Sequence, residues 1–268
     1  MFSELDSILN ISPENFPQTE FTLVSDRKAD ASFLIHYFLS FYLRAGCKVC
    51  FLGLVQSFSH YSAVSQRLGV SLIQAREKGQ LVFLEGLKGA LAVLLEEKPN
   101  PSAQTLGFLR SPHTGLRGLY EFVQESLMTK GEEGKWGPPV LIVDDLTVFL
   151  SLGVRVGAVL DFTHYCRAFV CSKLQGNVVM LIRGEEEEGD EEGSELLLKG
   201  LTHQCSLALR VEGLPTGYCR DIHGQMEVFR RVSGSCVGGL KTHKNLFQFK
   251  VHDKGASFFA RGTSSAVL

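Results

Sequence analysis

The chain has 268 residues, of which 44% are hydrophobic and 21% charged, a composition typical of a folded globular protein and unlike that of a disordered one. Its formal net charge of -2 gives no overall electrostatic reason to bind nucleic acid, so such binding would have to come from a local patch or from partners. A single domain spanning residues 1–268 is expected, because α/β domains of roughly 200–250 residues are common.

The lack of an expected signal peptide or membrane span, together with the cysteine usage, predicts a location in the cytoplasm or nucleus. The first fifteen residues carry acidic side chains where a signal peptide needs a basic and then an apolar stretch. The longest apolar run, 33–43, contains His36 and Ser40 and falls well short of the roughly 20 residues that cross a bilayer, so no membrane span is expected. The 7 cysteines at irregular spacing indicate reduced thiols, most of them in the core.

Short apolar and β-branched runs alternate with helical patterns, which is typical of crossover units and a largely parallel sheet. The expected strands are 21–25, 48–55, 81–87, 140–146, 178–183 and 207–211. The expected helices are 32–45, 61–68, 116–128, 156–170 and 195–203. The runs 140–143 and 178–182 are almost unbroken Val, Leu, Ile and Met, which predicts central strands covered by helices on both faces.

After Gly213 the pattern becomes that of antiparallel strands. The expected strands there are 226–232, 246–251 and 257–261, with a hairpin turn at 253–255. Segments 98–112 and 131–139 are rich in Gly, Pro and charge, so they predict surface loops. The expected fold class is therefore α/β, a three-layer domain with a mostly parallel central sheet and antiparallel C-terminal strands.

The first strand runs into a buried helix, and a later strand ends in Asp144-Asp145, which is the layout of a nucleotide-binding ATPase core. A phosphate loop between that first strand and helix needs glycines whose N–H groups surround the phosphates, a lysine, and a hydroxyl for magnesium. Laid over residues 25–32, the template meets Ser25 and Asp30 at its glycines and Ala31 at its lysine, and only Ser32 fits. We therefore expect a degenerate phosphate loop.

The charges of the loop also oppose phosphate binding. Asp26 and Asp30 would place negative charge beside any phosphate that the helix N-terminus attracts. Lys28 could replace the missing lysine, but without glycine the backbone cannot easily approach a phosphate. Asp144 and Asp145 are interpreted as caps of the following helix, one or both, in place of magnesium ligands. We expect no catalytic residue and no bound cofactor.

The other candidate motifs favour structural roles. Cys47 and Cys50 lie three apart on an expected strand, so their side chains point to opposite faces and no metal site is expected. His60 and His164 are interpreted as isolated structural histidines. Segment 234–238 has the outline of a nucleophile elbow with a cysteine, but no helix is expected after it, so a hairpin connection is favoured.

Charge is distributed unevenly toward the C-terminus. Residues 185–195 are acidic with no base, which predicts a solvated loop that repels nucleic acid. Residues 216–268 carry eight Lys or Arg against three acids, interleaved with phenylalanines, a pattern typical of a nucleic-acid surface but equally of strands with aromatics inward and charges outward. The candidate nucleic-acid-binding residues are Arg230, Arg231, Lys241, Lys244 and Lys250.

Several long segments resemble the family formed by the sixth subunits of the Elongator complex. They are the first strand with its helix, 54–61, 79–87, the strand ending in Asp144-Asp145, 257–260 and 266–268. The resemblance covers nearly the whole chain and implies a RecA-like fold that departs from active ATPases at the phosphate loop, as this sequence does. It supplies no catalytic residue.

The resemblance also implies partners and a process. It implies a non-catalytic subunit of a hetero-hexameric ring with the fourth and fifth Elongator subunits, found in cytoplasm and nucleus. That ring binds tRNA and supports wobble-uridine modification of the 5-carboxymethyl type by the catalytic subcomplex. Two alternatives remain: a divergent nucleotide hydrolase that uses Lys28 and Asp144, and a free-standing nucleic-acid-binding module that uses the basic C-terminal strands.

Overall fold

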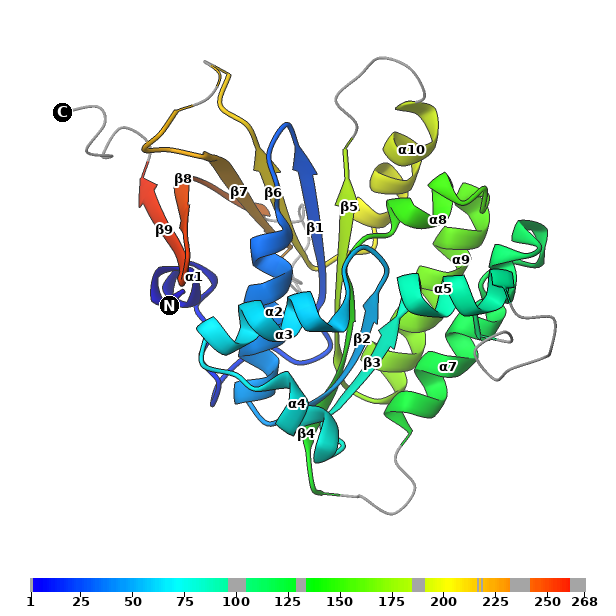
Figure 1. Cartoon of the computed structure of the whole chain (residues 1–268). Coiled ribbons are helices and arrows are strands. Elements are labelled where there is room, and N and C mark those ends of the chain that lie inside the picture. Colours follow the sequence, from blue (N-terminus) through cyan, green and yellow to red (C-terminus); the bar gives the residue numbers. More distant parts are fainter. Residues whose placement is uncertain are drawn as a thin grey trace, which may run out of the picture.

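The computed structural model describes residues 2–95, 105–128, 134–184, 191–215, 217, 219–231 and 242–260. In this part of the chain the strands form one 9-stranded sheet in the order β3-β2-β4-β5-β1-β6-β7-β8-β9 (Figure 1). The strands are β1 Phe21–Arg27, β2 Cys47–Gly53, β3 Leu81–Glu85, β4 Gly137–Val143, β5 Asn177–Arg183, β6 Leu207–Glu212, β7 Gly224–Arg231, β8 Thr242–His252 and β9 Gly255–Ala260. From β3 to β6 neighbouring strands are parallel, and from β6 to β9 they are antiparallel.

Helices cover both faces of the parallel part of the sheet. They are α1 Ser3–Leu9, α2 Ser32–Arg44, α3 Phe58–Arg67, α4 Leu72–Glu77, α5 Gly86–Leu95, α7 Arg117–Leu127, α8 Thr147–Ser151, α9 Val156–Arg167 and α10 Glu191–Thr202, with short turns η1 Gly107–Leu109 and η2 Pro112–Thr114 and a π-helical turn η3 Ala168–Lys173. The α/β class, the largely parallel sheet and the antiparallel C-terminal strands expected from the sequence are all confirmed.

Two hydrophobic cores lie on the two faces of the sheet. One core packs α1 to α4 against the sheet, and the other packs α5 and the helices from α7 to α10 (Figure 1). Residues of the central strands alternate between the cores: Val140 and Ile142 belong to the first, Leu141 and Val143 to the second. This alternation follows from the period-2 geometry of a strand, and it explains why β4 and β5 have almost no polar residue.

Helix α2 is the centre of the first core. Every residue from Phe33 to Leu43 is buried, because the sheet lies beneath the helix while α1, α3 and the C-terminal strands surround it. Ring contacts extend from α2 in several directions: Phe41 meets Phe16 at 5.8 Å between ring centroids, and Phe33 meets Phe249 at 5.1 Å. The absence of a polar face in the sequence thus predicted the position of this helix correctly.

Several expected boundaries were wrong. The expected strand 81–87 ends at Glu85, and α5 begins at Gly86, where a Cβ would lie 2.9 Å from the carbonyl oxygen of Gly53. Segment 137–139 belongs to β4 instead of a loop, and α1, α4 and α5 were not expected at all. Helix α10 begins at Glu191, so the acidic stretch is helical from 191 to 195; acidic residues in a first turn are favoured by the helix dipole.

The C-terminal hairpin agrees with the sequence. The turn residues Asp253 and Lys254 connect β8 to β9, which pair from His252 opposite Gly255 to Phe247 opposite Ala260. Of the expected loops, 98–104 and 131–133 lie outside the described residues, as does segment 234–238. None of the helices in the described ranges has the length and apolar character needed to cross a bilayer.

Two leucines in helices provide a matched test of this packing. Leu39 in α2 is 0% exposed, whereas Leu91 in α5 is 59% exposed. We expect Leu39→Ala to lower the free energy of unfolding by about 2–5 kcal/mol through lost burial and a residual cavity. Leu91→Ala should change it by less than about 0.5 kcal/mol, because the side chain is solvated and alanine favours helix. Urea unfolding of both variants measures this, and equal losses would contradict the assigned core.

Candidate functional site

The turn between β1 and α2 is much shorter than a phosphate loop. Ser25 and Asp26 lie within β1 and pair with β5 on one side and β6 on the other. Only residues 28–31 remain between the end of β1 at Arg27 and the start of α2 at Ser32. A phosphate loop needs consecutive free N–H groups that point at the ligand, whereas the first three template positions, 25–27, lie within β1. Lys28 lies in this turn, is exposed, and has a left-handed backbone conformation with a φ of 55°.

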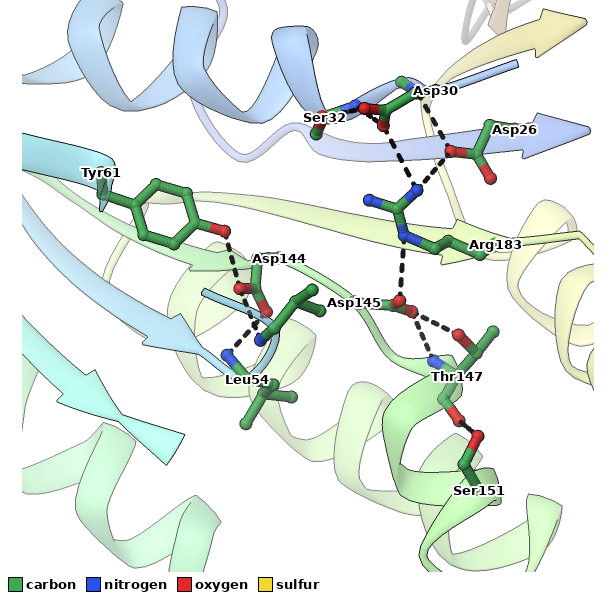
Figure 2. Close-up of polar contacts among 12 residues, drawn as sticks. Asp26, Asp30, Ser32, Leu54, Tyr61, Asp144, Asp145, Thr147, Ser151 and Arg183 are labelled. Carbon is green, nitrogen blue, oxygen red and sulfur yellow. Dashed lines mark hydrogen bonds and ion pairs between the residues drawn. The ribbon is translucent and has the colours of Figure 1, made fainter. Parts of the chain in front are cut away.

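Two N–H groups at the start of α2 donate to carboxylates, one from the end of β1 and one from the turn. Asp26 Oδ2 accepts a hydrogen bond from the Ala31 N–H at 3.0 Å, and Asp30 Oδ1 accepts one from the Ser32 N–H at 2.9 Å. The Ser32 hydroxyl, the one template position that fitted, donates to Asp30 Oδ2 at 2.7 Å (Figure 2). Two carboxylates therefore lie where a helix N-terminus would receive a phosphate.

Arg183, at the end of β5, holds these carboxylates together. Its Nη1 lies 3.3 Å from Asp26 Oδ2 and 3.2 Å from Asp30 Oδ1, and its Nε lies 3.2 Å from Asp145 Oδ2 (Figure 2). The close approach of β5 to β1 at this point requires Gly184, whose N–H donates to the Asp26 carbonyl oxygen at 2.8 Å. A Cβ at position 184 would lie 2.6 Å from that oxygen.

Burial and charge act against each other in this cluster, which comprises Asp26, Asp30, Asp145 and Arg183. Burial raises the pKa of Asp26 to about 6, although the Ala31 N–H and Arg183 both oppose the rise. Burial also raises the pKa of Asp145. For Asp30, burial is outweighed by the hydrogen bonds from Ser32 and by Arg183, so its pKa is lowered. One guanidinium thus faces three carboxyl groups, and a further anion would be repelled.

The two aspartates after β4 have different partners. Asp145 Oδ1 accepts from the N–H of Thr147 at 2.8 Å and from its hydroxyl at 2.5 Å, so it bonds to the first residue of α8, although the N-cap position of that helix is Leu146 and carries no side-chain cap. Asp144 turns the other way and accepts from the N–H groups of Leu54 and Val55 at 2.8 and 3.1 Å and from the Tyr61 hydroxyl at 2.7 Å. It caps no helix, because donors at the end of β2 and on α3 lie closer. Burial raises its pKa to about 6.

The candidate nucleic-acid-binding residues lie on β7 and β8. Strand alternation directs Arg230 toward α1, where it contacts Glu20 at 3.1 Å and the Leu9 carbonyl oxygen at 3.3 Å. Arg231 lies on the other face and donates to the His203 carbonyl oxygen at 2.6 Å. The register of β7 and β8 places Lys244 and Lys250 on the same face of the sheet as Arg231. Lys244 contacts Glu227 at 2.7 Å, and Lys250 contacts Asp221 at 2.9 Å. Lys241 lies outside the described residues.

Cys47 and Cys50 are buried, as expected of core thiols. His60, in contrast, lies beside another histidine and is not isolated as expected. Cys47 lies in the first core and Cys50 in the second, on opposite faces of β2. His60 is not isolated, because its ring centroid lies 5.6 Å from that of His36; the helix α2 brings His36 there from a distant part of the sequence. Over the ranges described, no three His, Cys, Asp or Glu side chains gather closely enough to hold a metal ion.

Sequence reasoning missed Arg183 and Tyr61 as members of this site. The sequence pattern places Arg183 only at the end of an expected strand. A charged residue that ends an otherwise apolar central strand was the available signal, because the carboxyl ends of parallel strands meet at one edge of a sheet. Tyr61 had no such signal, since its contact with Asp144 depends on how α3 packs.

Titration of Asp26 gives a test of this geometry. Its folded pKa of about 6 lies above the ordinary value of 3.8, so the folded state binds a proton more readily and this group favours folding increasingly as pH falls from 7 to 4. Asp26→Asn cannot titrate. The free energy of unfolding of the wild type relative to this variant should therefore rise by on the order of 2 kcal/mol over that range.

A second aspartate provides the control. Hydrogen bonding to Lys250 lowers the pKa of the exposed Asp221, so the corresponding difference for Asp221→Asn should stay nearly flat above pH 4 and decline only below it. Chemical denaturation at several pH values measures both differences. Parallel curves for the wild type and Asp26→Asn would show that Asp26 does not occupy a buried, carboxylate-rich position.

A family model and full-length relatives both relate the chain to the same protein family. Residues 2–253 match the family described as Elongation complex protein 6. The chain is 66% identical over 270 residues to Elongator complex protein 6 of Danio rerio and 53% identical over 271 residues to that of Homo sapiens, with 100% of both chains covered in each case. An uncharacterized Pyrococcus horikoshii protein, solved with an unknown peptide, shares the fold at 12% identity and a TM-score of 0.57 over 96% of each chain. By its family match and its full-length relatives, the chain belongs to the Elongator complex protein 6 family.

Proposed function

We propose that the chain is a single RecA-like domain that acts as a non-catalytic subunit of Elongator. It forms a hetero-hexameric ring with the fourth and fifth subunits, in cytoplasm and nucleus. The ring binds tRNA and supports wobble-uridine modification, of the 5-carboxymethyl type, by the catalytic subcomplex. The family match supports membership of the complex, and the site supports the non-catalytic role.

One observation carries the non-catalytic role: the protein's own carboxylates cap the helix N-terminus that an ATPase uses for phosphate. Asp26 and Asp30 accept from the N–H groups of Ala31 and Ser32, and Arg183 compensates part of their charge. A triphosphate would have to displace both carboxylates and then lie beside them. Nearby, Asp144 is 3% exposed and already accepts from three donors, which leaves little capacity for a magnesium ion.

Exposed apolar side chains support a role as a subunit. Leu87, Leu91 and Leu95 follow one another at intervals of four residues on α5 and are 55, 59 and 73% exposed. Residues four apart lie on the same side of a helix, so they form an apolar stripe on α5, the helix that directly follows the edge strand β3 (Figure 1). Apolar surface of this kind in a folded protein is typical of interfaces with other proteins.

Co-expression with the fourth and fifth Elongator subunits tests the assembly. We expect the three chains to purify together, with a native mass equal to two copies of each, and the complex to retard tRNA in a gel with strong salt dependence. The chain alone should retard tRNA weakly, because its overall charge is slightly negative. Native mass spectrometry and gel shifts at several salt concentrations measure these properties.

Two exposed lysines test, in the same experiment, whether the basic C-terminal strands contribute to tRNA binding. The side chains of Lys244 on β8 and Lys199 on α10 are 63 and 66% exposed, and each has an acidic neighbour. Lys244→Ala should weaken tRNA binding by the assembly and reduce its salt dependence by about one phosphate contact, whereas Lys199→Ala should not. A chain that stays alone in the presence of both partners would contradict the assembly, and equally tight tRNA binding by the isolated chain would favour the free-standing module.

A further inference from the structure

Cationic side chains gather where α9, α10 and the antiparallel strands meet, on the face of the sheet that carries the second core. The four residues, called the basic patch below, are Arg167 on α9, Arg210 on β6, Arg231 on β7 and Lys244 on β8. Arg167 and Arg210 precede the basic C-terminal segment 216–268, so the charge pattern of the sequence does not point to them. The patch therefore extends beyond the C-terminal strands.

The register of the strands places three of the four cations on one face of the sheet. Arg210 pairs with Glu227 across β6 and β7, and Phe229, two residues further along β7, pairs with Lys244 of β8. Alternate residues of a strand share a face, so Arg231 lies on this face as well. Phe229 packs against the second core, to which α9 and α10 also contribute, so the face is the one that these helices occupy.

Packing between α9 and α10 brings Arg167 to the same place. A Cβ at Gly200 of α10 would lie 2.8 Å from Leu160 Cδ2 of α9. Residues seven apart lie on one side of a helix, so Arg167 lies on the α10 side of α9, two turns beyond Leu160. Arg231 Nη1 reaches the end of α10 from the sheet and donates to the His203 carbonyl oxygen at 2.6 Å.

The thiol of Cys205 gives independent support for this grouping. Cys205 lies between α10 and β6 and is buried. Burial raises the pKa of this thiol, whereas Arg231, Arg210 and Arg167 each oppose the rise. Because an electrostatic effect weakens with distance, the three guanidinium groups surround one point of the structure.

Little negative charge compensates the patch. Glu227 contacts Lys244 at 2.7 Å and Arg210 at 3.8 Å, so one carboxylate is shared between two cations. Within the described part of the chain Arg167 has no hydrogen bond or ion pair, and Arg231 is bonded to a carbonyl oxygen and not to a carboxylate. The dipole of α10 accounts for Arg231 at its end, but not for Arg167, because α9 continues directly into η3. An anion among these cations would relieve their mutual repulsion.

The patch is open and extended. The side chains of Lys244 and Arg210 are 63 and 41% exposed, and Arg167 is exposed. The patch spans two strand spacings from β6 to β8, roughly 10 Å, and continues onto α9. A single phosphate cannot contact all these cations at once, whereas successive phosphates of a nucleic-acid strand can. Since α10 runs from Glu191 to Thr202, its acidic start lies about 17 Å from the end beside the patch.

We propose that the basic patch binds the phosphate backbone of RNA, with Arg167 and Arg210 as contacts outside the C-terminal strands. The inference rests on the proposed binding of tRNA by the ring, and it names the surface of this subunit that receives the tRNA. Contacts to phosphates position a nucleic acid and carry no base specificity, so the patch would accept different tRNA sequences equally.

Gel shifts of tRNA by the assembly with the fourth and fifth subunits test the patch. Arg167→Gln combined with Arg210→Gln should weaken tRNA binding about tenfold and lower the slope of log affinity against log salt by about two. Arg155→Gln combined with Arg117→Gln is the matched control, because it removes the same charge from exposed arginines at the starts of α9 and α7. This control should bind as the wild type does. Arg167→Lys combined with Arg210→Lys keeps the charge and should retain most of the affinity.

Native mass spectrometry of each assembly separates the possible outcomes. The glutamine variant of the patch should keep the mass of the wild-type assembly. If it alone fails to assemble, the patch is an interface between subunits and the proposal is overturned. If the wild-type assembly binds tRNA and the patch variant binds it with the affinity and salt dependence of the control, the proposal fails while the proposed function stands. An assembly that forms but never retards tRNA contradicts both.

Vesicles of phosphatidylserine and phosphatidylcholine provide a second probe, because a membrane surface is also anionic. Sedimentation with these vesicles should not distinguish the patch variant from its control. Vesicle binding that is lost in the patch variant alone, with unchanged tRNA affinity, would assign the patch to a membrane surface and overturn the proposal.

Discussion

The hydrogen bonds from the α2 N-terminus to Asp26 and Asp30 are the interaction on which the functional interpretation depends. The N-terminus of a helix that follows the first strand of a parallel sheet is a natural anion site. In this chain the anions are the side chains of Asp26, near the end of β1, and Asp30, in the turn, at 3.0 and 2.9 Å from the backbone nitrogens. Two N–H groups at this helix end are bonded without a ligand, and carboxylate oxygens lie where a phosphate would bind.

Sheet topology makes that arrangement stable. Because β5 lies between β4 and β1, the residue that ends β5 is placed between the carboxylates of β1 and of the β4–α8 connection. Arg183 occupies this position and contacts Asp26, Asp30 and Asp145 (Figure 2). Its fixed, planar set of donors suits several carboxylates at once. The charge of a lysine and a metal ion in an active ATPase is thus replaced in part by one arginine from a different strand.

Much of this could be predicted from the sequence, because it rests on local patterns. The unbroken apolar runs of β4 and β5 predicted buried central strands, and the all-apolar α2 predicted its own burial. Aspartates in place of loop glycines predicted a poor phosphate site. Local patterns also misled at 81–87, where a continuous apolar run conceals the change from β3 to α5 at Gly86.

Contacts between distant segments could not be predicted in the same way. Arg183 reaches Asp26 across 157 positions of sequence, and Tyr61 reaches Asp144 across 83, so both depend on strand order and helix packing. The grouping of His36 with His60 has the same origin. Lys244 and Lys250 were recognisable as basic residues, but their acidic neighbours Glu227 and Asp221 became apparent only with the register of β7 and β8.

The most direct measurement compares ATP with adenosine, because the two differ only in the triphosphate that the carboxylates should exclude. Calorimetric titration in the presence of magnesium should show that ATP binds no more tightly than adenosine, and Lys28→Ala should not alter either result. ATP binding that is saturable, much tighter than that of adenosine and lost in Lys28→Ala would show that the β1–α2 turn accepts phosphates, and would contradict the account.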